Sequence, residues 1–351
     1  MKSTLQTIFC LLLICTFSNT EANAQYTLDT KDFKAMNFRN IGPAGMSGRI
    51  TAIDVDLSDK ERIFAGSASG GLWLSENGGI NWDPIFDDQD VLSIGAVAVD
   101  QSNPSTIWVG TGEGNPRNSL NTGAGIFKSM DGGKTWKLMG LENTKVIHRI
   151  IVHRDNPDVV YVAAMGTPWG HSTDRGVYRT DDGGKTWTKI LYTNDTTGPG
   201  DLIVNPSNPN HIIAGMWQHL RRPYDFYSGG EGSCIHVSYD KGDTWKKIGT
   251  EEGMPKGELG RIGLAFAPSK PNIVYALIEA KENGLYKSTD GGDKWNLVSK
   301  KDIGNRPFYY SDLWVDPMNE NRIYNLWSYV SRSQDGGKTF KTIMDYGNNV
   351  H

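Results

Sequence analysis

The sequence predicts an all-β protein, arranged as a β-propeller of about six four-stranded blades. Forty-one glycines and fifteen prolines supply turns, eleven tryptophans supply large apolar anchors, and no segment carries a sustained 3.6-residue apolar period. The motif SMDGGKTW at 129–136 returns as SENGGINW, TDDGGKTW, SYDKGDTW, STDGGDKW and SQDGGKTF. Its Asp or Asn falls at 77, 131, 182, 240, 290 and 335, so the copies lie 54, 51, 58, 50 and 45 residues apart. Such a period, with several short strands in each unit, is typical of propeller blades.

Each unit repeats the same order of short strands. In the second unit, an apolar strand over 94–99 is followed by a polar turn and a second strand over 107–109. A variable loop, a third strand over 125–128, the motif and a fourth strand over 136–139 complete the unit. The first strands of the other units are expected at 49–53, 150–152, 202–204, 262–266 and 313–315.

The repeated motif has the composition of a tight turn. The Asp and the Ser or Thr two residues before it have short oxygen-bearing side chains, which accept hydrogen bonds from nearby backbone N–H groups. The glycine pair adopts positive φ at no steric cost, and the closing Trp or Phe is an apolar anchor for the space between sheets. Six copies around a ring lie too far apart to act on one bond. We therefore interpret the motif as scaffolding, neither catalytic nor metal-binding.

The first 24 residues are predicted to be an export signal, which leaves 25–351 as the propeller. Lys2 precedes an apolar run over 8–17 that is too short to span a bilayer, and Ala22-Asn23-Ala24 is a small-x-small cleavage site. The protein is then secreted or periplasmic, with no membrane insertion after cleavage. The six repeats either close a ring or form the N-terminal part of a larger propeller.

Charge and motif content exclude several function classes. The 36 basic and 40 acidic residues are spread without blocks, which argues against a nucleic-acid partner. The seven histidines show no His-x-x-x-His spacing, so no metal site is predicted. Cys234 is the one cysteine outside the signal, so no internal disulfide is expected. We expect no cofactor and a neutral or locally charged ligand.

The repeats resemble the Asp-box, or BNR, repeat, whose consensus is Ser/Thr-x-Asp-x-Gly-x-Thr-Trp. The segment over 38–43 (FRNIGP), the segment over 70–73 (GGLW) and the ending over 347–351 (GNNVH) are similar to exported bacterial proteins of the sortilin N-terminal (Vps10-like) and glycosyl hydrolase-like repeat group. The resemblance implies a propeller with the motif between third and fourth strands. It does not decide activity, because Asp-box propellers include hydrolases and receptors.

Two enzyme families with such propellers match only in part. A sialidase carries an early Phe/Tyr-Arg-Ile-Pro motif, which the segment over 38–43 approximates with broken spacing. In the xyloglucan-active family, the segment that resembles 67–73 carries an acidic residue where this chain has Ala68. One expected catalytic carboxylate is therefore absent.

The loops between second and third strands carry the candidate ligand-binding side chains. Aromatic rings stack on sugar rings, and charged groups at their edges accept or donate hydrogen bonds. With Arg149 of the third unit's first strand, the candidates are Glu113, Arg117, Arg149, Trp169, His171, Trp217, His219, Arg221, Arg222 and Tyr224.

The first strands offer candidates for acid–base catalysis. When these strands are aligned on their last apolar residue, the position three residues earlier holds Arg149, Asp201 and Asp312 in three units, and such positions approach the channel. Asp201 and Asp312 could act as the acid and base of a hydrolase, although solvated structural residues are the alternative. We predict an exported binding module, sortilin-like, for polysaccharide or a protein or peptide ligand. The alternative function is a xyloglucanase-like or sialidase-like glycoside hydrolase.

Overall fold

The six sheets predicted from the sequence are present in the computed structural model, which describes residues 49–117, 119–305, 307–309 and 312–344. Apart from two short 3-10 turns, Glu142–Thr144 and Thr250–Glu252, every regular element in these ranges is a strand. The chain divides into two units, and the described residues all fall in Gly48–His351. The predicted signal and the segments over 38–43 and 347–351 lie outside the described residues.

Each sheet is an antiparallel blade whose strands pair in chain order, apart from an additional short strand in blade 4. Blade 1 comprises β1 Ile50–Val55, β2 Ile63–Ser67, β3 Leu72–Ser75 and β4 Asp83–Pro84. Blade 2 comprises β5 Ile94–Val99, β6 Ile107–Thr111, β7 Ile126–Ser129 and β8 Lys137–Leu138. Blade 3 comprises β9 Ile147–Val152, β10 Val160–Ala164, β11 Gly176–Thr180 and β12 Thr188–Leu191. Blade 4 comprises β13 Thr197–Asn205, β14 Asn208–Arg221, β15 Phe226–Ser228, β16 Cys234–Ser238 and β17 Lys246–Ile248. Blade 5 comprises β18 Ile262–Phe266, β19 Val274–Ile278, β20 Gly284–Ser288 and β21 Asn296–Ser299. Blade 6 comprises β22 Asp312–Asp316, β23 Asn319–Leu326, β24 Val330–Ser333 and β25 Lys341–Met344.

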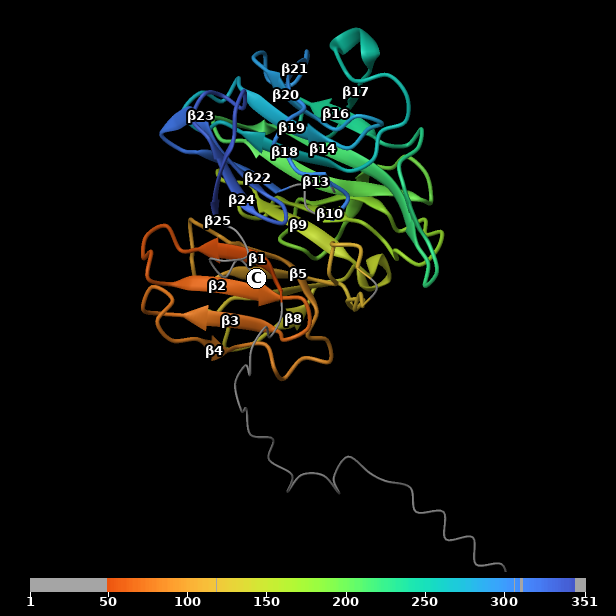
Figure 1. The fold of residues 1–351 in the computed structure, drawn as a ribbon. Helices are drawn as coiled ribbons and strands as arrows, with labels where there is room; N and C mark the ends of the chain where they lie inside the picture. Colours follow the sequence, from red (N-terminus) through yellow and green to blue (C-terminus); the bar gives the residue numbers. More distant parts are fainter. Residues whose placement is uncertain (1–48, 118, 306, 310–311, 345–351) are drawn as a thin grey trace, which may run out of the picture. The chain divides into compact units, whose positions relative to one another are not determined.

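The first strands of the blades lie together at the centre of the assembly (Figure 1). From β1 through β5, β9, β13 and β18 to β22, each of these strands contacts the next. This order confirms the six-bladed propeller.

Apolar clusters fill the spaces between consecutive blades. Between blades 1 and 2, Phe64 and Leu72 pack against Val97 and Val109, and Trp136 of the repeated motif packs on the same cluster. Equivalent clusters join blades 2 and 3, 3 and 4, 4 and 5, and 5 and 6. In blades 2 to 6, the closing aromatic of the motif therefore packs between its own blade and the one before it.

The repeated motifs, which we call the repeat turns (75–82, 129–136, 180–187, 238–245, 288–295 and 333–340), share one hydrogen-bond pattern. In the second, the Ser129 hydroxyl donates to Asp131 (2.8 Å) and accepts from the Gly133 N–H (2.9 Å). Asp131 also accepts from the N–H (2.9 Å) and hydroxyl (2.6 Å) of Thr135. These bonds stay within the turn, as the composition predicts.

Blade 4 departs from the expected pattern. The stretch from Trp217 to Tyr227, expected as a long loop, contains the end of β14 and most of β15, which pairs with β14 from Arg221 to His219. Because β14 continues past the edge of its blade, the two strands form a hairpin extension. Its backbone is tied to blade 3 by a 2.7 Å hydrogen bond from the Arg221 N–H to the Pro168 carbonyl.

In the described part of the chain, no helix has both the length and the apolar character needed to cross a bilayer.

Candidate functional site

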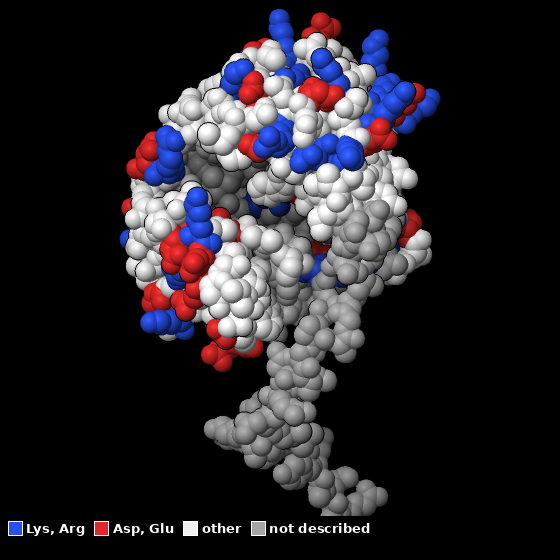
Figure 2. All heavy atoms as spheres, turned by 60° about the vertical axis from the view of Figure 1, so that its left-hand side comes forward, with Lys and Arg blue, Asp and Glu red and all other residues white. Residues whose placement is uncertain are grey.

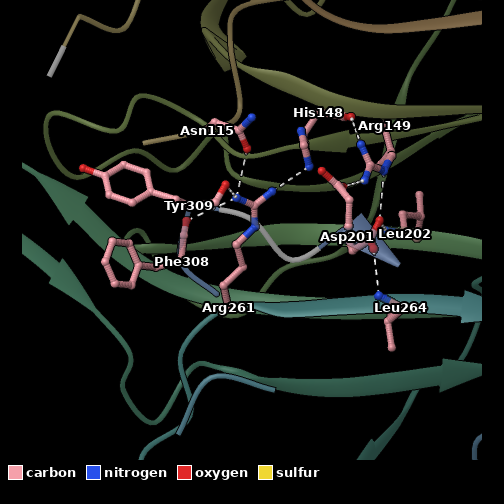
Figure 3. Close-up of polar contacts among 10 residues, drawn as sticks. Asn115, His148, Arg149, Asp201, Leu202, Arg261, Leu264, Phe308 and Tyr309 are labelled. Carbon is pink, nitrogen blue, oxygen red and sulfur yellow. Dashed lines mark hydrogen bonds and ion pairs between the residues drawn. The ribbon is translucent and has the colours of Figure 1, made fainter. Parts of the chain in front are cut away.

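Arg149, Asp201 and Asp312, aligned from the sequence, are brought into contact by the first strands of three blades. Arg149 in β9 donates from Nε to Asp201 in β13 (2.9 Å) and from Nη2 to Asp312 at the start of β22 (2.8 Å). Blades 3, 4 and 6 are therefore joined by one guanidinium. Figure 3 shows Arg149 facing Asp201 from the neighbouring strand.

The two carboxylates have different surroundings. Asp201 is buried and also accepts hydrogen bonds from the N–H groups of Leu202 (2.9 Å) and Leu264 (2.8 Å). It therefore links blade 4 to blade 5. Asp54 forms the same bracket between blades 1 and 2, accepting from Val55 in its own strand and Val99 in β5.

Asp312 is the more accessible partner, with 30% of its side chain exposed. Burial alone would lower the pKa of Arg149, but the carboxylates of Asp201 and Asp312 outweigh it and raise that pKa above its ordinary value. The guanidinium is therefore charged at every physiological pH, and it holds the partly exposed Asp312 side chain in place.

Arg261 forms a second centre just before β18. Its buried guanidinium donates to Asn115 Oδ1 (3.0 Å), to the carbonyls of Phe308 and Tyr309 (3.2 Å each) and to His148 Nε2 (3.0 Å) (Figure 3). These partners belong to blades 2 and 3 and to the segment that enters blade 6. Arg261 therefore ties four blades together.

An aromatic stack continues from Arg261 into blade 4. The guanidinium lies 5.3 Å from the Trp217 ring centroid, and Trp217 stacks on His219 with centroids 4.0 Å apart. Both rings are buried, and Trp217 Nε1 donates to Ser228 (2.9 Å). These two predicted ligand residues thus lie in the wall of the site, inside β14.

Arg175 closes the other end of this stack, 3.5 Å from His219 Nδ1. It is fully buried and donates to the carbonyls of Thr167 (2.7 Å), Gly170 (3.2 Å) and Thr196 (3.0 Å). Burial lowers its pKa to about 10. Arg175 is not among the residues predicted from the sequence, because an arginine before a strand carries no signal that it will be buried.

Glu113 is also buried. It receives a bidentate pair from Arg49, at 2.8 Å and 2.5 Å, which joins blade 2 to the residue that precedes β1. Its carboxylate is thus engaged within the protein.

The remaining predicted residues, apart from Arg221, lie at the surface. Tyr224, at the tip of the β14–β15 hairpin, is 81% exposed, and Trp169 on blade 3 is also exposed. Arg222 pairs with Asp225 (3.2 Å) and His171 with Asp195 (2.9 Å). Arg117 is exposed, whereas Arg221 is largely buried and its guanidinium lies 5.4 Å from the Phe226 ring centroid.

Glu279, just after β19, is a second residue that the sequence analysis missed. It accepts hydrogen bonds from the Ser228 hydroxyl (2.7 Å) and the Arg261 N–H (2.8 Å). Burial raises its pKa above the ordinary value, although both bonds and the Arg261 charge oppose that effect. The site thus includes a carboxyl group in low-polarity surroundings.

The described ranges contain no group of three His, Cys, Asp or Glu side chains arranged to hold a metal ion. Figure 2 shows a hollow on one face of the described part, with basic atoms visible within it.

The family profile described as "Sortilin, neurotensin receptor 3" matches residues 124–251. These residues run from the end of blade 2 through blade 4 and include Trp169 and Tyr224. The match covers roughly a third of the chain.

Curated relatives are xyloglucanases. Xyloglucanase Xgh74A of Acetivibrio thermocellus is 25% identical over 88% of this chain and 40% of its own length. A Paenibacillus xyloglucanase is 23% identical over 88% and 32%. An oligoxyloglucan-reducing end-specific xyloglucanase of Emericella nidulans is 24% identical over 84% and 40%. The chain spans at most about 40% of the length of these relatives.

Solved structures share the fold. The GH74 xyloglucanase of Xanthomonas campestris aligns with a TM-score of 0.54 at 14% identity, over 83% of this chain and 52% of that one. YCF48 from Cyanidioschyzon merolae aligns with a TM-score of 0.55 at 16% identity, over 86% of both chains. At these identities, the likeness concerns the propeller alone.

Proposed function

We propose that this chain is an exported propeller of the glycoside hydrolase type that acts on a polysaccharide of the xyloglucan class. The observation that carries the proposal is the solvent-facing carboxylate of Asp312, held by Arg149 at the channel. Similarity to several xyloglucanases over most of the chain supports the choice of substrate class. The function predicted first, a sortilin-like binding module, has less support than its alternative.

Substrate binding rests on exposed aromatic rings beside the channel. The Trp169 loop and the Tyr224 hairpin both connect second to third strands, and Asp312 begins a first strand, so blade topology places all three on one side. Aromatic faces stack on sugar rings without requiring charge on the ligand. A neutral polysaccharide suits this surface.

Glycosidic cleavage uses a carboxylate that the substrate can reach. In this proposal Asp312 supplies that carboxylate, because 30% of its side chain is exposed and Arg149 holds it at 2.8 Å. In this proposal Asp201 is a positioning residue: the N–H groups of Leu202 and Leu264 hold it in place, and it in turn orients Arg149.

The repeat turns are, in this proposal, Asp-box repeats with a purely structural role. Their Asp side chains bond within their own turns, which connect third to fourth strands and thus lie on the side opposite Asp312. They contribute stability and leave the chemistry to the channel side.

The test measures reducing ends released from xyloglucan, cellulose and a sialylated glycan. Asp312→Asn and Asp201→Asn are compared with Asp316→Asn, which lies at the other end of β22 and pairs with Arg322 (2.8 Å). Xyloglucan cleavage that is lost in Asp312→Asn and kept in Asp316→Asn supports the proposal. Xyloglucan retention without cleavage defeats the hydrolase function but keeps the polysaccharide ligand, whereas absence of both defeats the proposal.

Peptide recognition is the second candidate, favoured by the sortilin profile over 124–251. The exposed Trp169 and Tyr224 fall within that match. Two results together would favour peptide recognition. The chain would bind members of an unbiased peptide library but not xyloglucan, and Tyr224→Ala would weaken the peptide binding.

A further inference from the structure

The residue that follows the second strand of a blade pairs with the residue that precedes the first strand. In blade 5 this residue is Glu279, whose N–H donates to the Arg261 carbonyl (2.9 Å) and whose carbonyl accepts from the Gly260 N–H (2.8 Å). The first of these bonds recurs in blades 1, 2 and 3, where the same position holds Ala68, Gly112 and Met165. Of these four residues, only Glu279 has an ionisable side chain. Because it opens a connection from second to third strand, blade topology places it on the same side as Asp312.

The Glu279 side chain is held by one of its two carboxyl oxygens. Oε2 accepts from the Ser228 hydroxyl (2.7 Å) and from the Arg261 N–H (2.8 Å). It lies so close to Gly260 that a Cβ added there would be 2.1 Å away. Oε1 makes no hydrogen bond within the described residues, and it is not among their buried atoms that lack a partner, so it is open to solvent. The carboxyl group is therefore fixed in orientation, with one oxygen left for a ligand.

Ser228 is itself held in place and lies on a strand face that carries aromatic rings. Its Oγ accepts from Trp217 Nε1 (2.9 Å), which directs the hydroxyl hydrogen to Glu279. Ser228 and Phe226 are two residues apart in β15, so their side chains lie on the same face of the hairpin. The Phe226 ring lies 5.2 Å from the Phe308 ring between centroids, and both rings are partly exposed. The face that holds Glu279 can therefore also stack on a sugar ring.

Glu279 and Asp312 lie in unlike surroundings. Asp312 forms an ion pair with Arg149 (2.8 Å), whereas Glu279 forms none within the described residues. Burial raises the pKa of Glu279 above its ordinary value, although the bonds from Ser228 and Arg261 oppose that effect. Burial lowers the pKa of Arg261, and the charges of Asp312 and Glu279 both oppose that effect, which places the two carboxyl groups within electrostatic range of one guanidinium. Carboxyl groups set apart by their surroundings in this way suit acid–base hydrolysis.

We propose that Glu279 is the catalytic acid of the glycoside hydrolase proposed above, with Asp312 as the base; the inference rests on that function. Oε1 of Glu279 gives a proton to the glycosidic oxygen, and the bond from this oxygen to the anomeric carbon breaks, with its electron pair staying on the oxygen. A water oxygen bonds to the anomeric carbon, and one proton of that water passes to Asp312. Solvent then returns a proton to Glu279 and takes one from Asp312, so the net change is the addition of one water molecule across the glycosidic bond.

The first test compares the parent chain, Glu279→Gln and Glu282→Gln in the release of reducing ends from xyloglucan. Glu282 is the matched control, because it lies in the same connection, is exposed and pairs with Lys300. We expect kcat to fall about 100-fold or more in Glu279→Gln and to stay within about twofold in Glu282→Gln. On the 2,4-dinitrophenyl glycoside of a xyloglucan oligosaccharide, Glu279→Gln should stay within about fivefold of the parent chain, because this leaving group departs without a proton.

The pH profile separates acid catalysis from a structural role. Xyloglucan cleavage by the parent chain should fall as the pH rises through the pKa of Glu279, since the acid loses its proton, and this basic limb should be absent in Glu279→Gln. Ser228→Ala is the second variant, and it also serves if Glu279→Gln does not fold. It removes a hydrogen bond that lowers the pKa of Glu279, so the basic limb should move to higher pH. Melting curves check the fold of each variant.

The outcomes distinguish this inference from the function on which it rests. Equal losses of Glu279→Gln on both substrates, or a basic limb that Ser228→Ala leaves in place, overturn the inference. Full xyloglucan activity in Glu279→Gln also overturns it, while the proposed function stands with another acid. A parent chain that releases no reducing ends from xyloglucan overturns both.

Discussion

Arg261 in blade 5 donates a 3.0 Å hydrogen bond to Nε2 of His148 in blade 3. A guanidinium has no acceptor atom, so the imidazole nitrogen must be the unprotonated acceptor. The bond is buried and joins two blades that do not follow one another in the chain.

We expect Arg261→Met to lower the free energy of unfolding by about 3 kcal/mol, since it strips partners from several buried polar groups. Urea denaturation measures the loss. Arg222→Met is the control: its exposed pair with Asp225 contributes within about 0.5 kcal/mol. Equal losses of unfolding free energy in both variants would contradict the role of Arg261 in joining four blades.

His148 makes stability depend on pH. Burial lowers its pKa well below the ordinary value, and the charges of Arg149 and Arg261 lower it further. A folded-state pKa below the unfolded one gives stability that is complete above about pH 6.5 and is lost as pH falls. The melting temperature should therefore decline between pH 6.5 and 4.5, and less steeply in His148→Gln. His171→Gln, at an exposed position, should follow the parent chain; an unchanged slope in His148→Gln would contradict the assignment.

The turn carboxylates act in a lower pH window. Hydrogen bonds from the hydroxyl and N–H of Thr135, then from Ser129, lower the pKa of Asp131 to about 2. Its contribution is present above about pH 4 and is lost as pH falls toward 2. In Asp131→Asn the melting temperature should depend less on pH in that range, because an amide side chain does not titrate. The amide should still fit the turn, since Asn77 occupies the same position in the first turn and accepts the same bond from Ser75 (3.0 Å). Asp155→Asn, outside the turns, should leave the pH profile unaltered.

Two turn tryptophans should differ in their effect on stability. Trp295 is buried between blades 4 and 5, and Trp295→Ala should cost about 3 to 5 kcal/mol in urea unfolding. Trp82 occupies the same turn position in blade 1 but is 37% exposed, so Trp82→Ala should cost about 1 kcal/mol or less. A similar cost in both would show that Trp82 is also packed.

Much of the architecture is legible in local sequence. The spacing of the repeat turns predicted six blades, because each turn satisfies its own polar groups and needs only nearby residues. Alignment of the first strands also brought Arg149, Asp201 and Asp312 to one channel, since a repeated blade places equivalent positions at equivalent heights. Whether these residues bind or cleave a substrate stays a prediction.

What local sequence determined is therefore the repeat: its strands, its turns and the positions that face the channel. Tertiary structure alone decided the burial of Arg175 and Trp217 and the meeting of Arg261 with His148 and of Arg49 with Glu113. Such contacts depend on how many degrees each blade turns from the last and on how far β14 runs past its sheet. No spacing of residues along the chain encodes those quantities, because they arise from packing between blades.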